Sequence, residues 1–170
     1  MISLDISKCT GCRTCETVCT FYHTGRINRN LARIRVVNIF ETGIDFPAQC
    51  VQCQERYCAD CPSNAITIGN LGQIIISPTV CTLCGICEKK CPIGAINIFN
   101  EFVYVCDLCG GEPKCVENCT ENAITYNSES KNLVSLAETL AETKKMNPSE
   151  KRMQYAQKIG ANLRKTWRQE

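Results

Sequence analysis

The stretch CTLCGICEKKCPIGAINI, residues 81–98, decides the fold of this chain. Its cysteines are Cys81, Cys84, Cys87 and Cys91. Two-residue gaps separate the first three, and such gaps bend the chain into a tight loop in which three thiolates converge on one small site. Gly85 relieves crowding inside that loop because it has no Cβ atom. We expect the last cysteine to begin a short helical turn that leads away from the site and that Pro92 ends.

This spacing resembles the cysteine motif of bacterial ferredoxins, which binds a [4Fe–4S] cluster. Three further groups of four cysteines vary the pattern, with middle gaps of two, four and five residues. These groups are Cys9, Cys12, Cys15 and Cys19; Cys50, Cys53, Cys58 and Cys61; and Cys106, Cys109, Cys115 and Cys119. Thr20 and Thr120 follow the first and last groups where ferredoxins have proline, which leaves a smaller cluster or zinc open at one outer site.

Cysteine is unusually frequent in this chain, with 16 residues among 170, whereas aromatic residues make up only 6%. We therefore expect metal clusters to replace much of an apolar core, and the chain without metal to be largely unfolded. Disulfides are the alternative use of so many cysteines. Clusters are favoured because the N-terminus shows no signal peptide and thiols stay reduced in a cytosol.

Other function classes receive little support from the composition. No stretch approaches the ~18 uninterrupted apolar residues of a membrane helix, and the formal net charge is only +2. We expect a cytoplasmic protein with no direct membrane insertion and no nucleic-acid partner. No acid or base stands out as catalytic, so we expect no catalytic site in this chain.

A short repeat follows the last cysteine of three groups. The segments are PSNAITI at 62–68, PIGAINI at 92–98 and TENAITY at 120–126, each with a small alanine before an alternating strand. We expect residues 65–68 to pair with 73–76, and residues 95–98 to pair with 101–105 across a two-residue turn. Further strands are expected at residues 2–6 and 34–39, with Gly43 and Pro47 marking the exit from the second.

In a two-cluster ferredoxin the fourth cysteine of each motif binds the cluster of the other motif. This exchange, applied to the second and third groups and to the first and fourth, uses every cysteine once. The expected ligand sets are set a, Cys9, Cys12, Cys15 and Cys119; set b, Cys106, Cys109, Cys115 and Cys19; set c, Cys50, Cys53, Cys58 and Cys91; and set d, Cys81, Cys84, Cys87 and Cys61.

The expected fold class is α+β, with two ferredoxin-like modules built from short β-hairpins, one nested inside the other. The inner module spans about residues 48–99, and the outer module combines residues 1–47 with 100–127. Residues 1–127 thus form a four-cluster domain, and residues 128–170 form a helical C-terminal extension.

The four groups together, ending in CDLCGGEPKCVENC at residues 106–119, resemble the four-cluster electron-transfer subunits of anaerobic redox complexes. Such subunits accompany molybdenum or tungsten oxidoreductases, formate dehydrogenases, hydrogenases and carbon monoxide dehydrogenase. The stretch CTFYHTGRINRNLARIRV, residues 19–36, is similar to the small subunits of tungsten enzymes of the aldehyde:ferredoxin oxidoreductase family, which includes a dearomatising benzoyl-CoA reductase.

The resemblance implies an electron relay. Four [4Fe–4S] clusters would pass single electrons between a larger catalytic subunit, with a tungsten- or molybdenum-pterin cofactor, and an external carrier or a further carrier subunit. A zinc-stabilised interaction module is an alternative from a different class, because pairs of Cys-x-x-Cys also bind zinc. A stand-alone ferredoxin without a fixed partner is a third possibility.

Two helices are expected in the C-terminal extension. The first is indicated by Leu133, Leu136, Ala137, Leu140 and Ala141 at helical spacing, followed by Lys144 and Lys145. The second begins with Asn147 as N-cap, Pro148 at the first position and Glu150 three residues after the cap. Its apolar stripe is Met153, Ala156, Ile159, Leu163 and Trp167. The helices either pack on the ferredoxin-like core or form an arm that clasps another subunit, with Trp167 as an anchor.

His23 is the only histidine and follows the first cysteine group by four residues. One interpretation is a loop histidine hydrogen-bonded near the first clusters. The other is a metal ligand or a proton relay. The first is favoured because sixteen cysteines already fill four sites.

Overall fold

The computed structural model describes residues 1–130 and 133–167, the last of these in its backbone only. It has an α+β fold, as expected, in which short helices alternate with two-stranded antiparallel sheets. The elements are β1 (Ile2–Leu4), α1 (Thr14–Thr24), β2 (Arg35–Ile39), β3 (Ile44–Ala48), β4 (Ile66–Ile68), β5 (Ile74–Ile76), α2 (Ile86–Lys90), β6 (Asn97–Phe99), β7 (Phe102–Tyr104), α3 (Lys114–Glu117), β8 (Ile124–Tyr126), α4 (Ala137–Thr143) and α5 (Pro148–Trp167).

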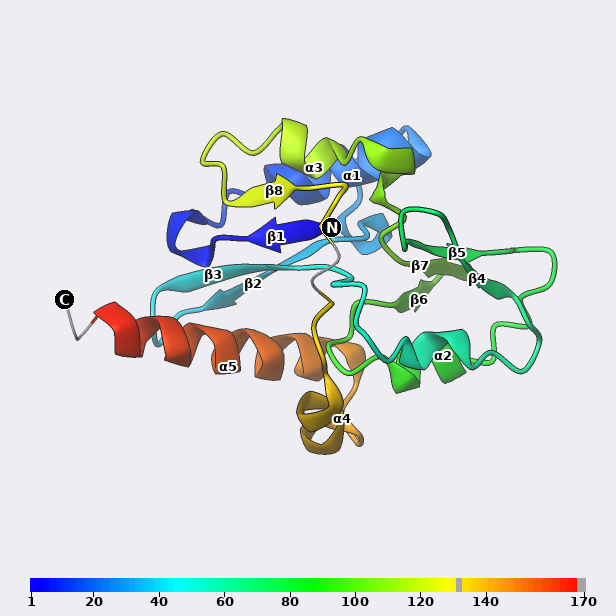
Figure 1. Cartoon of the computed structure of the whole chain (residues 1–170). Helices are drawn as coiled ribbons and strands as arrows, with labels where there is room; N and C mark the ends of the chain where they lie inside the picture. Colours follow the sequence, from blue (N-terminus) through cyan, green and yellow to red (C-terminus); the bar gives the residue numbers. More distant parts are fainter. Residues whose placement is uncertain (131–132, 168–170) are drawn as a thin grey trace.

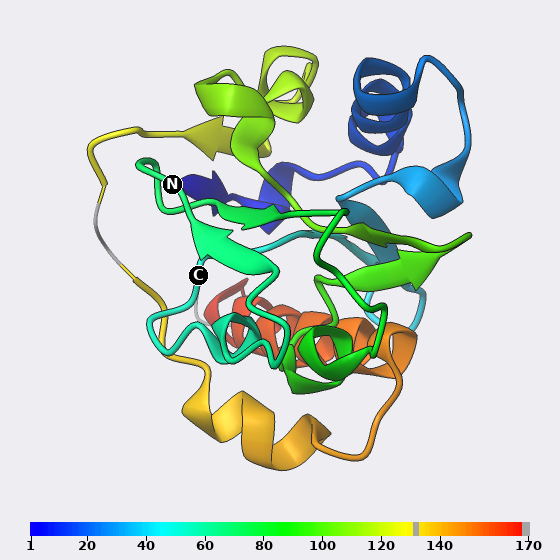
Figure 2. The ribbon, with the colours of Figure 1, turned by 90° about the vertical axis from the view of Figure 1, so that its right-hand side faces the viewer.

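The sheets lie in layers that separate α1 and α3 from α5 (Figure 1). Strands β1 and β8 pair with Ile2 opposite Tyr126, so the two ends of the cysteine-rich region meet. Hairpin β2–β3 lies between this pair and α5. Figure 2, turned by 90°, brings hairpins β4–β5 and β6–β7 to the front.

The first strand is shorter than predicted and ends at Leu4. Asp5 stops it, because its Oδ1 accepts a hydrogen bond from the Ser7 backbone N–H and caps a 3₁₀ turn at Ile6–Lys8. Ile6 is still buried, but it faces the core from this turn rather than from a strand.

Hairpin β4–β5 confirms the predicted pairing, with Ile66 opposite Ile76. In hairpin β6–β7 the two-residue turn is at Asn100 and Glu101, one residue later than predicted. Both have positive φ, 47° and 64°, which is the backbone of the type I′ turn that favours hairpins. Ile96, expected in the strand, precedes it and is 2% exposed in the core.

The sequence does not predict strand β3, because Gly43 and Pro47 are typical of the exit from a strand. Pro47 instead lies within β3, opposite Val36. A two-stranded sheet leaves β3 an unpaired edge, and proline is tolerated on an edge strand because its missing N–H breaks no ladder there. Residues 34–39 do contain the predicted strand, as β2.

The first C-terminal helix is shorter than expected and turns a different face inward. Leu133 is exposed and lies before α4, whose N-cap is the buried Leu136. The buried positions of α4 are Thr139 and Thr143. The predicted apolar face, Ala137, Leu140 and Ala141, instead lines an open groove of about 800 Å³ against residues 55–60.

Helix α5 begins at Pro148, as predicted. The Asn147 Oδ1 accepts from the Ser149 and Glu150 N–H groups, and Glu150 Oε2 accepts from the Asn147 N–H, which together make a capping box. None of the described helices is both long and apolar enough to cross a membrane.

Helix α5 packs on hairpin β2–β3, which confirms the core-packing interpretation of the extension (Figure 1). Ala156 is fully buried, and the Tyr155 ring meets Phe46 edge-on at 5.6 Å. Met153 was predicted in the buried stripe but is 37% exposed, because Tyr155 and Ala156 face the hairpin instead. The Trp167 side chain, predicted as an anchor, lies outside the described residues.

Candidate metal centres

In the first, third and fourth groups the last two cysteines are four residues apart, on or beside a short helix. Cys15 and Cys19 are both buried on α1, and Cys115 lies on α3 four residues before Cys119. In the third group the helix precedes the fourth cysteine, contrary to the expected helical turn after it. Helix α2 begins after Gly85, whose φ is +74°, and ends with Cys91 as its C-cap. The left-handed glycine at the start of the helix accounts for this difference, because it turns the chain before Cys87.

Three small cavities are each lined by four cysteines. The first is lined by Cys9, Cys12, Cys15 and Cys119; the second by Cys61, Cys81, Cys84 and Cys87; and the third by Cys50, Cys53, Cys58 and Cys91. These are the residues of sets a, d and c. In each cavity three cysteines come from one group and the remaining cysteine from another.

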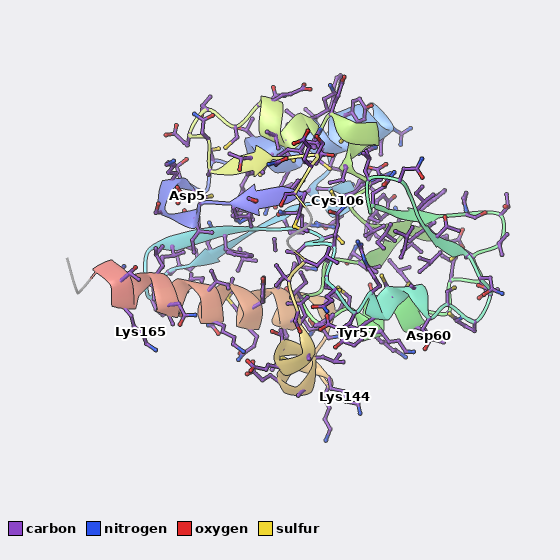
Figure 3. All side chains as sticks on the ribbon, viewed as in Figure 1. Asp5, Tyr57, Asp60, Cys106, Lys144 and Lys165 are labelled. Atoms are coloured by element: carbon purple, nitrogen blue, oxygen red, sulfur yellow. The ribbon has the colours of Figure 1, made fainter. Side chains whose placement is uncertain are left out.

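The residues of set b influence one another electrostatically. Burial, with smaller contributions from the charges of Cys19 and Cys109, raises the pKa of the Cys115 thiol to about 12. Burial also raises the pKa of Cys106 well above its usual range, with added contributions from Cys50, Cys115 and Cys19. Figure 3 shows Cys106 near the middle of the molecule, between the β1–β8 pair and the β6–β7 hairpin.

Each Cys-x-x-Cys loop contains a left-handed residue at the same place, two positions after the first cysteine. These residues are Gly11, Gln52, Leu83 and Leu108, with φ between 50° and 66°. Alternation of right- and left-handed backbone turns successive N–H groups toward one concave side, which is a preferred site for anions. The shared conformation suits loops that surround the negative sulfur atoms of a cluster.

Most of the thiols are held in surroundings that oppose their charged form. Burial raises the pKa of Cys15, Cys50 and Cys58 to about 12, and that of Cys87 to about 11. Thiolates are the metal-binding form, so metal binding here must displace protons. All sixteen cysteines are free of disulfides.

The donor set fits an iron–sulfur cluster. Four sulfur ligands per cavity are the usual complement of a [4Fe–4S] cluster. In addition, Gln49, which precedes Cys50, is only 2% exposed, and neither its amide nitrogen nor its amide oxygen has a partner among the described residues. A buried amide without a partner is costly, and the sulfur atoms of a cluster are acceptors that would suit its nitrogen, though not its oxygen.

His23 lies on α1 rather than in the expected loop. Its Nε2 atom is 3.6 Å from Cys109 Sγ and 3.5 Å from Asp107 Oδ1, and the Asp107 carboxylate also pairs with Arg33. Burial lowers the pKa of His23, as does Arg33, whereas Asp107 raises it. The histidine therefore contacts a cysteine of set b, close to the predicted position near the first clusters. Sequence reasoning missed Asp107 and Arg33, because the contacts of Asp107 with His23 and with Arg33 join residues far apart in the sequence.

Comparison with known proteins supports the cysteine chemistry. Residues 74–97 match the family model described as the 4Fe-4S binding domain, which includes the stretch that begins at Cys81. This stretch therefore has the sequence of a ferredoxin-type cluster-binding domain.

Two relatives extend the likeness over most of the chain. The chain is 41% identical over 124 residues to the polyferredoxin-like subunit of the aliphatic sulfonate oxidoreductase of Pyrococcus furiosus, covering 71% of each protein. It is 29% identical to a subunit of the anaerobic dimethyl sulfoxide reductase of Escherichia coli, over 72% of this protein and 70% of the relative. The chain belongs to the family of polyferredoxin-like iron–sulfur electron-transfer proteins.

Among solved structures, a subunit in the BamBC active-site complex of benzoyl coenzyme A reductase matches with a TM-score of 0.45 and 28% identity. The match covers 74% of this protein and 76% of that subunit.

Proposed function

We propose that this protein is the electron-relay subunit of an oxidoreductase complex and carries four [4Fe–4S] clusters in sets a to d. When bound, each cluster accepts and releases one electron at a time. The observation that carries the proposal is the convergence of four cysteines from two groups in each of three separate cavities. The pairing of β1 with β8 supports an outer module, residues 1–47 with 100–127, around an inner module of about residues 48–99.

The sets follow one another in the order a, b, c, d. Cys115 of set b lies close enough to Cys15 of set a that the charge of Cys115 raises the pKa of Cys15. Cys106 of set b is affected in the same way by Cys50 of set c. Sets c and d are joined by the 3₁₀ turn Tyr57–Ala59, which carries Cys58 and leads to Cys61. A linear order of this kind suits stepwise transfer of single electrons.

The two ends of this order lie nearest the solvent. The exposed cysteines are Cys12 of set a and Cys84 of set d, whereas sets b and c have none. Exposed ligands bring a cluster within reach of a docked protein, so sets a and d are the proposed points of contact with redox partners. In sets b and c, two cysteines of each set are buried and the other two are partly buried.

The partner that we propose is a larger catalytic subunit with a tungsten- or molybdenum-pterin cofactor, together with an external electron carrier. The names of the relatives support an oxidoreductase partner, because they are subunits of a sulfonate oxidoreductase and of a dimethyl sulfoxide reductase. Tungsten is favoured by the resemblance of residues 19–36 to the small subunits of tungsten enzymes.

Anaerobic purification of the native protein tests this function. We expect a brown protein with about 16 iron atoms per chain and a co-purifying larger subunit that contains tungsten. A colourless protein with about four zinc atoms per chain would contradict the relay and support an interaction module instead. A brown monomer with full iron content but no partner would contradict only the subunit role.

A further inference from the structure

Helix α5 carries a buried lysine in its first turn. Lys151 is 1% exposed and is the largest fully buried side chain among the described residues. Its Nζ atom donates hydrogen bonds to the carbonyl oxygens of Lys89 and Cys91, the second at 3.1 Å. Within residues 1–130 and 133–167, no carboxylate lies within ion-pair distance of this ammonium group. Among the described residues, its hydrogen-bond partners are therefore these two carbonyl groups.

A buried charge without a counter-charge is costly, and native proteins rarely keep one. Burial lowers the pKa of Lys151, whereas the negative charges of Cys91 and Glu88 raise it. Cys91 belongs to set c and is itself buried. Its Sγ accepts a hydrogen bond from the Ala95 backbone N–H at 3.2 Å. A cluster held by Cys91 and its set would therefore place a large negative charge beside the segment that Lys151 contacts.

The neighbours of Lys151 fix its position against this segment. Thr143 Oγ1 donates to the Pro92 carbonyl at 2.8 Å, and Arg152 Nη1 donates to the Gly94 carbonyl at 2.7 Å. Gly94 is so close to α5 that a Cβ atom there would lie 2.1 Å from the Pro148 carbonyl oxygen. Helix α5 is therefore packed directly against the 91–94 segment, and Lys151 has little freedom to move away.

We propose that Lys151 is a fixed positive charge that raises the reduction potential of the cluster in set c relative to the other three clusters; this rests on the proposed function. Reduction adds one electron to a site that is already anionic. A buried cation stabilises the reduced state more than the oxidised state, and it does so strongly where water is excluded. Nearby charge is one of the means by which a protein sets cluster potentials. The C-terminal extension thereby tunes one step of the relay.

Redox titrations followed by EPR, on the purified full chain with its clusters, test the proposal. The comparison is Lys151→Met against Lys158→Met, which removes the same charge from a half-buried position of α5 that pairs with Glu142. Cys53→Ser identifies the EPR signal of set c. In Lys151→Met we expect the equilibrium constant for reducing that cluster to fall at least tenfold, which is about 59 mV for a one-electron couple. The other three midpoints, and all four in Lys158→Met, should stay close to those of the native protein.

An unchanged set c midpoint in Lys151→Met, or an equal fall at all four clusters, would overturn the proposal. If Lys151→Met fails to retain this cluster, Lys151→Gln and Lys151→Arg separate charge from packing. If Lys151→Gln loses the cluster of set c and Lys151→Arg retains it, the positive charge is what the site requires. If both variants lose the cluster, the proposal is overturned, because the role of Lys151 is then packing alone. Iron analysis of the native protein checks the relay separately, because a zinc protein would contradict the proposed function before any potential is compared.

Discussion

Left-handed backbone at one position of each Cys-x-x-Cys loop is a residue-scale feature with an energetic cost. Only Gly11 adopts it freely, whereas Gln52, Leu83 and Leu108 have a Cβ atom and lose about 1–2 kcal/mol each. Strain of this kind persists where the surrounding structure demands it, and it concentrates at functional sites. The repetition in all four groups indicates that the loop shape is set by what the cysteines bind.

Gly94 provides a residue-scale prediction because it combines positive φ, +60°, with close contact to Pro148. Gly94→Ala adds left-handed strain and an overlap with the backbone of α5. The overlap should cost about 2 kcal/mol beyond the strain, and so lower the melting temperature by about 4–8 °C more than strain alone. The measurement is thermal unfolding of the loaded protein at one fixed scan rate.

Gly25→Ala is the matched control, because Gly25 has φ +66° but no atom within 4 Å of its missing Cβ. It should show the strain alone, about 1 kcal/mol. If the melting temperature fell equally in the two variants, α5 would have moved to accommodate the new Cβ atom at Gly94. The packing of α5 on the 91–94 segment would then be loose.

Cys91→Ser tests the exchange of ligands between groups. The variant should damage the cluster of Cys50, Cys53 and Cys58, with which Cys91 shares a cavity, and spare the cluster of Cys81, the first cysteine of its own group. EPR spectra and iron content of the purified variant measure this, with Cys84→Ser as the reciprocal control. Loss of the set d signal in Cys91→Ser would contradict the nested arrangement.

At the scale of elements, the extension is held by apolar contacts between α5 and hairpin β2–β3. Gly160 lets the helix approach the hairpin, since its missing Cβ would lie 3.3 Å from Ile44. Tyr155 is 9% exposed and meets the Phe46 ring at an interplanar angle of 85°. Edge-to-face pairs of this kind add to the free energy of burial.

Tyr155→Ala should therefore destabilise the protein by about 3 kcal/mol, since removal of a buried aromatic ring costs roughly 3–5 kcal/mol. Met153→Ala, two residues away on the exposed side of α5, should change stability by less than about 0.5 kcal/mol. Chemical denaturation of the loaded protein under anaerobic conditions compares them. Similar losses at both positions would mean that α5 does not pack on the hairpin as described.

Local patterns predicted the elements whose causes are local. Asn147 and Glu150 specify the start of α5 by themselves, and the cysteine spacing specifies the loops. Long-range contacts explain the errors. Pro47 lies in a strand because its sheet has a free edge, and Leu133 is outside a helix although its spacing is helical. The burial of Lys151 depends on the fold of residues 89–94, more than fifty positions earlier, and no sequence signal marks it.

At the scale of the whole molecule, the apolar core is divided into two clusters, and cysteines belong to both. Cys58 and Cys91 lie in the cluster with Phe46 and Tyr155, and Cys15 and Cys19 lie in the cluster with Ile34. The core is thus continuous with the candidate metal centres. The stability of the two apolar clusters must therefore depend on whether the cysteines hold metal, and metal binding must depend on the fold of these clusters.

Removal of iron should consequently unfold the whole chain, including α5, although α5 binds no metal in our proposal. The packing surface of α5 includes the 91–94 segment, which the cluster of set c would hold in place. Most of the stability of a helix in a protein comes from such tertiary packing. Treatment of the loaded protein with an oxidant and a chelator should therefore abolish most of the helical circular dichroism signal together with the brown colour. Anaerobic addition of iron and sulfide to the reduced chain should restore both. Retention of the full helical signal, with an unchanged cooperative melting transition after the iron has gone, would show that the apolar contacts alone sustain the fold.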